Sequence, residues 1–140
     1  MKLPHIVKYT DKVLQGESGL FVIYLNPAKR GDIGLFVHEY EHVKQWYLCS
    51  VIGLICALCV YLLLGNLTAS LFICAVSISF NGILYTYVKP FRQWAEVKAF
   101  RAQIKVTEGD HKEFFSYALA NNYKLNISYG KALKLLYGNN

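Results

Sequence analysis

Residues 34–53, "GLFVHEYEHVKQWYLCSVIG", join two different kinds of sequence. The first half holds His38, Glu39 and His42 in the pattern H-E-x-x-H, which is typical of a zinc site on a helix. The second half begins an uncharged stretch that runs from Tyr47 to Val88. This juxtaposition predicts a mainly α membrane protein with a metal site close to the membrane.

The uncharged stretch spans 42 consecutive residues without Asp, Glu, Lys, Arg or His, in a chain of 140 residues that is 54% hydrophobic. A bilayer core about 30 Å thick takes ~20 apolar residues per helix, so the stretch fits two spans. Gly65 and Asn66 supply the turn between them. We expect a transmembrane helical hairpin of Tyr47–Leu64 and Leu67–Val88. The alternative is a buried helix pair in a soluble protein.

Charge predicts how the hairpin is oriented. The N-terminal segment has no apolar run and no small-residue cleavage site, so we expect the first 46 residues to stay on the cytosolic side. By the positive-inside rule, both termini and the active site are then cytosolic, and we expect a bacterial inner membrane protein. The net charge of +6 suits anionic headgroups, and no basic cluster interleaved with aromatics indicates nucleic-acid binding. The basic residues flanking the hairpin are Lys29, Arg30, Lys44, Lys89, Arg92, Lys98, Arg101 and Lys105.

Aromatic and small residues refine the hairpin. Small side chains on the second span predict close helix packing, and Asn81 is placed to hydrogen-bond across to the first span. Amphipathic aromatic residues favour the membrane interface. Those expected there are Trp46, Tyr47, Tyr85, Tyr87 and Trp94.

The remaining segments divide the chain into three parts. Residues 1–46 contain a β-rich run at 19–25, "GLFVIYL", and a helix over 33–46 that Asp32 caps and no stop signal separates from the first span. Residues 47–88 form the hairpin. Residues 89–140 form a C-terminal helical part. Its expected helices cover 91–106 after Pro90, 110–122 with a capping-box start at Asp110 and Glu113, and 128–137.

The H-E-x-x-H motif assigns a role to each of its polar residues. His38 and His42 lie four residues apart on one helix face, so both imidazoles are able to bind one Zn²⁺ ion. Glu39 is placed to accept a proton from a zinc-bound water as that water attacks a carbonyl. The alternative is that the three are ordinary surface residues on a charged helix face.

A third protein ligand has to come from beyond the hairpin, because residues 43–95 contain no His, Asp or Glu. The metzincin extension of the motif is ruled out, since it needs Gly and His where this chain has Gln45 and Leu48. Glu96 is the first acid after the second span and lies within an expected helix. The full set of candidates is Glu96, Glu108, Asp110, His111 and Glu113.

The sequence "VHEYEHVKQW", two spans and then "WAEVKAFRAQ" resemble the gluzincin metallopeptidases, with a layout similar to the HtpX and CAAX-prenyl protease families. The resemblance implies a zincin-like core with a short β element, Zn²⁺ ligands His38, His42 and Glu96, and Glu39 as general base. It departs from those families at Phe100, where they carry an Asp that supports the site. It also departs in having a single hairpin, as a minimal form would.

These observations predict a membrane-anchored zinc metallopeptidase that acts on a protein or peptide substrate and is held in the lipid bilayer. The oxyanion of the reaction is often stabilised by Tyr or His, and the choice among Tyr40, Tyr117, Tyr123 and Tyr129 stays open. The strand at 19–25 either pairs with extended substrate or packs on the helices. The rival prediction is a non-catalytic membrane hairpin protein, such as a phage or bacterial lysis or assembly factor, whose motif is vestigial or coincidental.

Overall fold

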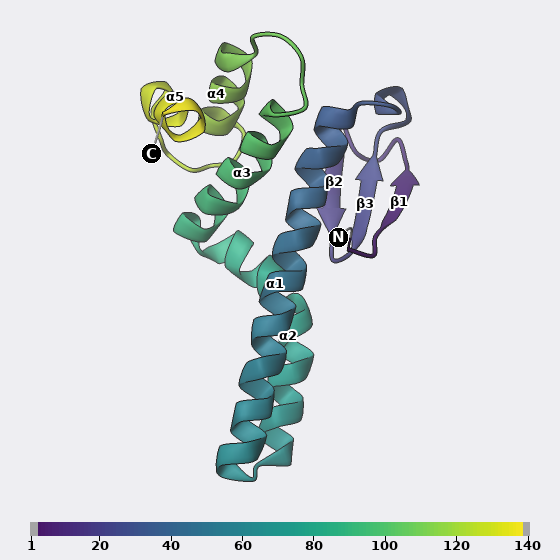
Figure 1. Cartoon of the computed structure of the whole chain (residues 1–140), viewed down its shortest axis with the longest axis vertical. Coiled ribbons are helices and arrows are strands. Elements are labelled where there is room, and N and C mark those ends of the chain that lie inside the picture. The colour runs from purple at the N-terminus through teal and green to yellow at the C-terminus, as the bar shows by residue number, and fades with distance from the viewer. Residues whose placement is uncertain (1–2, 139–140) are drawn as a thin grey trace.

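The computed structural model describes residues 3–138 and has a head carried on a long helical hairpin (Figure 1). The head comprises residues 3–46 and 88–138, and the hairpin lies between them. A small sheet packs on one side of the first helix, and three short helices lie on its other side (Figure 1). The molecule is mainly helical, as predicted.

Helix α1 (Ile33–Leu64) is continuous from the motif to the tip of the hairpin. The Asp32 side chain caps it by accepting a hydrogen bond from the Leu35 amide at 2.8 Å, as the sequence predicts. Gly65 ends it in the left-handed conformation at φ 61°, which glycine adopts without strain. Helix α2 (Leu67–Tyr87) then returns antiparallel to α1 (Figure 1).

Both helices are long and apolar enough to cross a membrane. Only 11% and 6% of their most apolar 18-residue windows are buried within the protein, unlike the core helices of a soluble protein. The helices pack closely through small residues: Gly53 faces Ser77, and Ser70 donates a hydrogen bond to the Ala57 carbonyl at 2.7 Å. The Cys49 thiol donates to Asn81 Oδ1 at 3.6 Å, so Asn81 does bond across the hairpin.

The sheet has three strands, β1 (Ile6–Tyr9), β2 (Gly16–Gly19) and β3 (Val22–Leu25), in the order β1-β3-β2. β3 pairs parallel with β1 and antiparallel with β2. The strand predicted over 19–25 is therefore β3, shorter than expected and central. Because both edges of β3 are taken, the prediction that this strand offers an edge to substrate is wrong; the strand with a free edge beside α1 is β2.

Helices α3 (Lys89–Ile104), α4 (Lys112–Asn121) and α5 (Tyr129–Tyr137) form the rest of the head. Pro90 lies in the first turn of α3, and Ser128 caps α5 by accepting from the Lys131 amide at 3.2 Å. The capping box expected at 110–113 is not formed: α4 begins at Lys112, and Asp110 instead accepts from the Lys112 amide at 3.1 Å. Their shared core is made of Phe100, Phe115, Ala118, Leu119, Leu125, Ala132 and Leu136.

Candidate metal centre

His38, His42 and Glu96 come together where α1 crosses α3. His38 Nε2 lies 3.4 Å from Glu96 Oε2, and His42 Nε2 lies 3.4 Å from Glu96 Oε1. The three ligand atoms lie within 4.8 Å of one another. His38 is 4% exposed and Glu96 is fully buried, so the carboxylate ends against the two imidazoles with little access to water.

Two observations test whether these residues fit a metal ion. Zinc bound by nitrogen and oxygen at about 2.0–2.1 Å in a tetrahedron has ligands about 3.3 Å apart. The two nitrogen-to-oxygen separations of 3.4 Å, one to each oxygen of the Glu96 carboxylate, are close to that spacing, and one ligand atom from each residue lies within 4.8 Å of the others. In addition, the buried Glu96 Oε2 has no hydrogen-bond partner among residues 3–138, a costly condition that a cation would relieve. The donor set is therefore suited to holding a metal ion, and its nitrogen and oxygen ligands are of the kind that zinc accepts.

The outer nitrogens of both imidazoles are held by glutamines. His38 Nδ1 lies 3.1 Å from Gln103 Oε1, and His42 Nδ1 lies 2.9 Å from Gln45 Oε1. An amide oxygen only accepts, so each Nδ1 carries the proton and each Nε2 keeps its lone pair for a metal. Gln45 is itself fixed, because its amide nitrogen donates to the Ala95 carbonyl at 3.0 Å.

Phe100 occupies the position where the resembled families have a supporting Asp. Its ring meets the His38 ring edge to face, with centroids 4.6 Å apart. Phe100 therefore restrains His38 by packing, while the polar support comes from Gln103 nearly one helical turn further on. Support for the imidazoles is present although the residue expected to give it is not.

Glu39 lies beside this cluster and is 6% exposed. It packs against β2: a Cβ added to Gly16 would lie 3.1 Å from Glu39 Cγ and 3.2 Å from Oε1. Burial raises the pKa of the Glu39 carboxyl, with partial opposition from His38, His42 and the hydroxyl of Ser18. A carboxylate of raised basicity close to two imidazoles is suited to accepting a proton.

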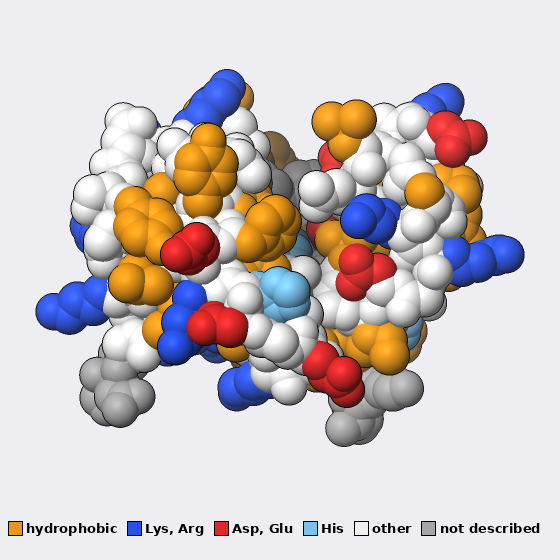
Figure 2. Space-filling model, turned by 90° about the horizontal axis from the view of Figure 1, so that it is seen from above, with side chains coloured by type: hydrophobic (Ala, Val, Ile, Leu, Met, Phe, Trp, Pro, Cys, Tyr) orange, Lys and Arg blue, Asp and Glu red, His pale blue; other side chains and the backbone are white. Residues whose placement is uncertain are grey.

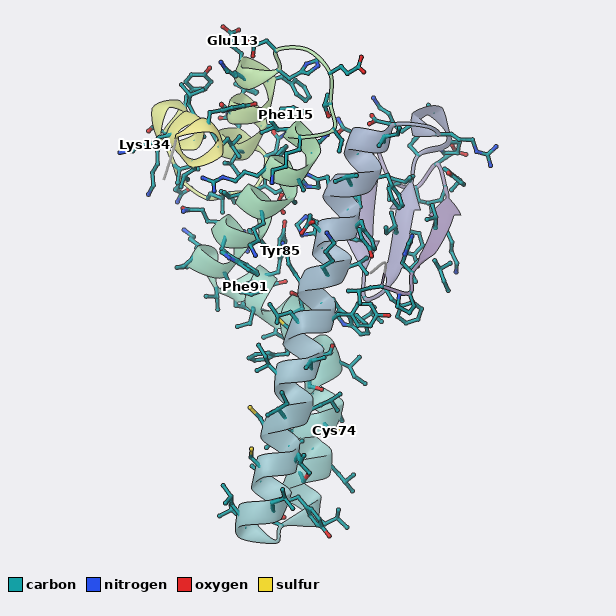
Figure 3. All side chains as sticks on the ribbon, viewed as in Figure 1. Cys74, Tyr85, Phe91, Glu113, Phe115 and Lys134 are labelled. Carbon is teal, nitrogen blue, oxygen red and sulfur yellow. The ribbon has the colours of Figure 1, made fainter. Side chains whose placement is uncertain are left out.

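Two tyrosines reach the same carboxylate from other elements. Tyr85, near the end of α2, donates a hydrogen bond to Glu96 Oε1 and lies at the junction of α2 with the head (Figure 3). Tyr123 follows α4, and its pKa is raised by burial and then by the charges of Glu96 and Glu39, so its hydroxyl stays protonated. Burial alone would raise the pKa of Glu96, but His38, His42 and the Tyr85 hydroxyl lower it below its usual value.

Arg92 ties these two tyrosines together. Its guanidinium donates to the carbonyls of Tyr85 at 2.7 Å and Tyr123 at 3.2 Å, and also to that of Thr86. The carbonyls of Tyr85 and Thr86 lie in the last turn of α2, where a helix leaves such acceptors unpaired. One side chain therefore fixes the end of the hairpin and the loop after α4 around Glu96.

A cavity of about 560 Å³ opens onto the cluster. Figure 2, which views the molecule from above, shows a hollow between the two sides of the head. The walls come from β2, from α1 and, unexpectedly, from the upper part of α2. Its lining includes Gly16 to Leu20, His38, Glu39, His42, Trp46, Ile78, Ser79, Asn81, Gly82, Tyr85, Thr86, Glu96 and Tyr123.

The structure separates the candidates that the sequence left open. Glu108, Asp110, His111 and Glu113 lie outside this cavity, and His111 lines a second pocket between α4 and the preceding loop. Among the four candidate tyrosines, only Tyr123 lines the cavity. Tyr117 and Tyr129 are 63% and 43% exposed, and Tyr40 accepts from the Leu3 amide at 2.6 Å.

Sequence reasoning missed Tyr85, Gln45 and Gln103. It assigned Tyr85 to the membrane interface, and the two glutamines follow no spacing rule that marks a metal site. Their only signal is helical spacing: Gln45 lies three residues after His42 on α1, and Gln103 lies seven residues after Glu96 on α3.

No family model, curated protein or solved structure matches the chain. The arrangement of the site itself is therefore what indicates a function.

Proposed function

We propose that the protein is a zinc-dependent metallopeptidase anchored in a membrane by its hairpin. The observation that carries this proposal is the convergence of His38, His42 and Glu96, whose ligand atoms lie within 4.8 Å of one another, with Glu39 beside them in an open cavity. Three protein ligands with room left for a water are typical of catalytic rather than structural zinc.

Different residues of the chain have different roles in the proposed peptide hydrolysis. Bound zinc would supply a water of lowered pKa and polarise the substrate carbonyl. Glu39 takes the proton of that water and passes it to the leaving amine. The protonated hydroxyl of Tyr123 is the donor available to the carbonyl oxygen as negative charge develops on it. Tyr85 and the glutamines hold the ligands in position.

The proposed setting is a bilayer, with both termini and the metal site on the cytosolic side. The low burial of both apolar helices supports it, since water would be a poor solvent for so much exposed apolar surface. The basic residues that flank the hairpin support the orientation by the positive-inside rule. A bacterial inner membrane is the membrane we propose.

Metal analysis of protein purified in detergent tests the proposal. We expect about one zinc per chain in the wild type and loss of zinc in His38→Ala and Glu96→Ala. His111→Ala is the matched control and should keep its zinc, because His111 lies in the other pocket. Absence of zinc from the wild type after growth with added zinc would favour the rival, a non-catalytic hairpin protein.

Proteolysis tests the role of the base separately. Glu39→Gln should keep its zinc and lose peptidase activity by at least about a hundredfold, because an amide cannot accept the proton. Undiminished activity in that variant would refute Glu39 as the base while leaving the metal centre standing.

A further inference from the structure

In the bilayer setting proposed above, the cavity at the candidate metal centre extends below the level at which the hairpin enters the membrane. Its upper wall holds His38 and Glu39, but its lower wall is formed by four residues of α2, which are Ile78, Ser79, Asn81 and Gly82. Those residues face Cys49 to Gly53 of α1, as the Cys49–Asn81 bond and the Gly53–Ser77 contact show. Both segments belong to the uncharged stretch. The cavity therefore continues from the head into the depth of the hydrocarbon.

Helix geometry gives the height of the metal centre above this boundary. Trp46 directly precedes the expected first span, which begins at Tyr47, and its indole nitrogen donates to the Ile78 carbonyl at 2.7 Å. With a rise of 1.5 Å per residue, His42 and His38 lie about 6 and 12 Å above Trp46 along α1. An extended chain covers ~3.3 Å per residue, so about two to four residues bridge that height.

The tip between β2 and β3 reaches the same boundary. Leu20 and Phe21 are 46% and 36% exposed there, and the Phe21 ring lies 5.9 Å from the Trp46 ring. Exposed apolar residues beside an interfacial tryptophan are suited to the headgroup region. The free edge of β2 thus runs from Glu39, which Gly16 contacts, down to the membrane surface at Leu20.

The lower part of the cavity carries polar side chains although it lies at the depth of the hydrocarbon. Ser79 and Asn81 line it, and Gly82 leaves the backbone of α2 open to it. Polar groups at that depth normally face a cavity or a functional path rather than lipid. A backbone that leaves its helix inside a membrane needs hydrogen-bond partners, and this wall supplies them.

We propose that the substrate is a polypeptide with its own membrane span, bound in extended form along β2. The bond that is cleaved then lies about two to four residues from the cytosolic end of that span, the distance set by helix rise and strand rise. This inference rests on the proposed peptidase function and names its substrate class.

The test uses zinc-loaded protein in liposomes with substrates that carry one span and a mixed-sequence cytosolic segment. We expect cleavage to map two to four residues from the span, and the same segment as a soluble peptide to be cleaved at least about tenfold more slowly. Cleavage mapped ten or more residues from the span, or equal cleavage of the soluble peptide, would overturn the inference and leave the peptidase function intact.

A matched pair of variants probes the lower cavity. A Cβ at Gly82 meets nothing within 4 Å, so the side chain of Gly82→Phe starts in open space beside the cavity. It should lower cleavage of the anchored substrate at least about tenfold with unchanged zinc content, because the path of the substrate is blocked. Ile83→Phe, at the same depth but outside the cavity, should leave cleavage unchanged. Equal activity of the two variants would contradict the inference.

Photo-cross-linking separates failure of this inference from failure of the peptidase proposal. A photoreactive residue in place of Ile78, in zinc-loaded Glu39→Gln, should capture the anchored substrate next to its span and not the soluble peptide. Capture without cleavage by the wild type would support the substrate path and refute the peptidase. Cleavage by the wild type without capture in the cross-linking variant would support the peptidase function and refute the substrate path.

Discussion

At the scale of single residues, the centre depends on buried charges that are satisfied only as a group. Glu96 is fully buried and Glu39 nearly so, and each faces the imidazoles of His38 and His42. Isolated, a carboxylate at such depth would be costly. The two glutamines and two tyrosines fix the orientation of these groups, so the site is held in place by hydrogen bonds before any ion binds.

The raised pKa of Glu39 makes a signed prediction about stability. A carboxyl whose folded pKa lies above its unfolded pKa of 4.5 binds protons more strongly in the folded state. Its contribution to the free energy of unfolding is therefore present below pH 4.5 and is lost as the pH rises from 4.5 through the folded pKa. Replacing it by neutral Gln removes this loss. In metal-free protein, Glu39→Gln should therefore melt at a higher temperature than wild type at pH 8, and the difference should shrink towards pH 4. A pH-independent difference would contradict it.

Gly16 gives a second prediction at this scale. An added Cβ would lie 3.1 Å from Glu39 Cγ, so Gly16→Ala has to displace Glu39, the proposed base, by a few tenths of an ångström. We expect kcat/KM to fall about tenfold with zinc content unchanged, because small misplacements of a reacting group are costly. Gly130→Ala is the control, since its Cβ meets nothing within 4 Å on α5. Loss of zinc in Gly16→Ala would show that the effect is not confined to the base.

At the scale of elements, the sequence predicts the hairpin better than the sheet. Forty-two uncharged residues with Gly65 and Asn66 at the centre leave little choice of structure, and the helix ends agree within one residue. In contrast, β2 has the sequence "GESG", which contains no β-branched or aromatic residue. It becomes a strand because it pairs with the edge of β3. Pairing of this kind depends on the tertiary structure, so no pattern in the local sequence predicts it.

Some residues of the candidate site could likewise be predicted from the sequence, and others could not. The H-E-x-x-H residues and Glu96 follow from spacing and from resemblance, and the structure brings their side chains together. The position of Tyr85 at the site could not be predicted, because nothing in the local sequence distinguishes it from the other ten tyrosines as a partner of Glu96. Its role depends on how α2 meets α3, which is a matter of three-dimensional packing.

Close packing of the hairpin supplies the third prediction. A Cβ at Gly53 would overlap the Ser77 side chain and come within 3.2 Å of its Cα, so Gly53→Ala must push α1 and α2 apart. We expect a loss of about 1–3 kcal/mol in the free energy of unfolding in detergent, as for other overpacked contacts. Gly82→Ala meets nothing within 4 Å and should be neutral or slightly stabilising. Equal stability of the two variants would contradict this packing.

At the scale of the whole molecule, the two sides of the head meet at the candidate metal centre. The sheet and α1 form one side of the head, and α3 to α5 form the other, each with its own apolar core (Figure 1). Figure 2 shows the hollow between the two sides. His38 and His42 belong to one side and Glu96 to the other, and the chain that connects them passes through the whole hairpin. An ion bound there would join two sides that are otherwise connected chiefly through helix packing.

Removal of the metal should therefore loosen the head as a whole. Free zinc at a hundred times its dissociation constant stabilises a folded protein by about 2.7 kcal/mol, which for a chain of this size is ~5–10 °C in melting temperature. We expect a chelator to lower the melting temperature of the wild type by that amount and to increase hydrogen exchange in α3 and in α1 near His38. Glu96→Ala should show no chelator effect, and His111→Ala should behave as wild type. A chelator that leaves wild-type melting and exchange unchanged would refute a metal that joins the two sides.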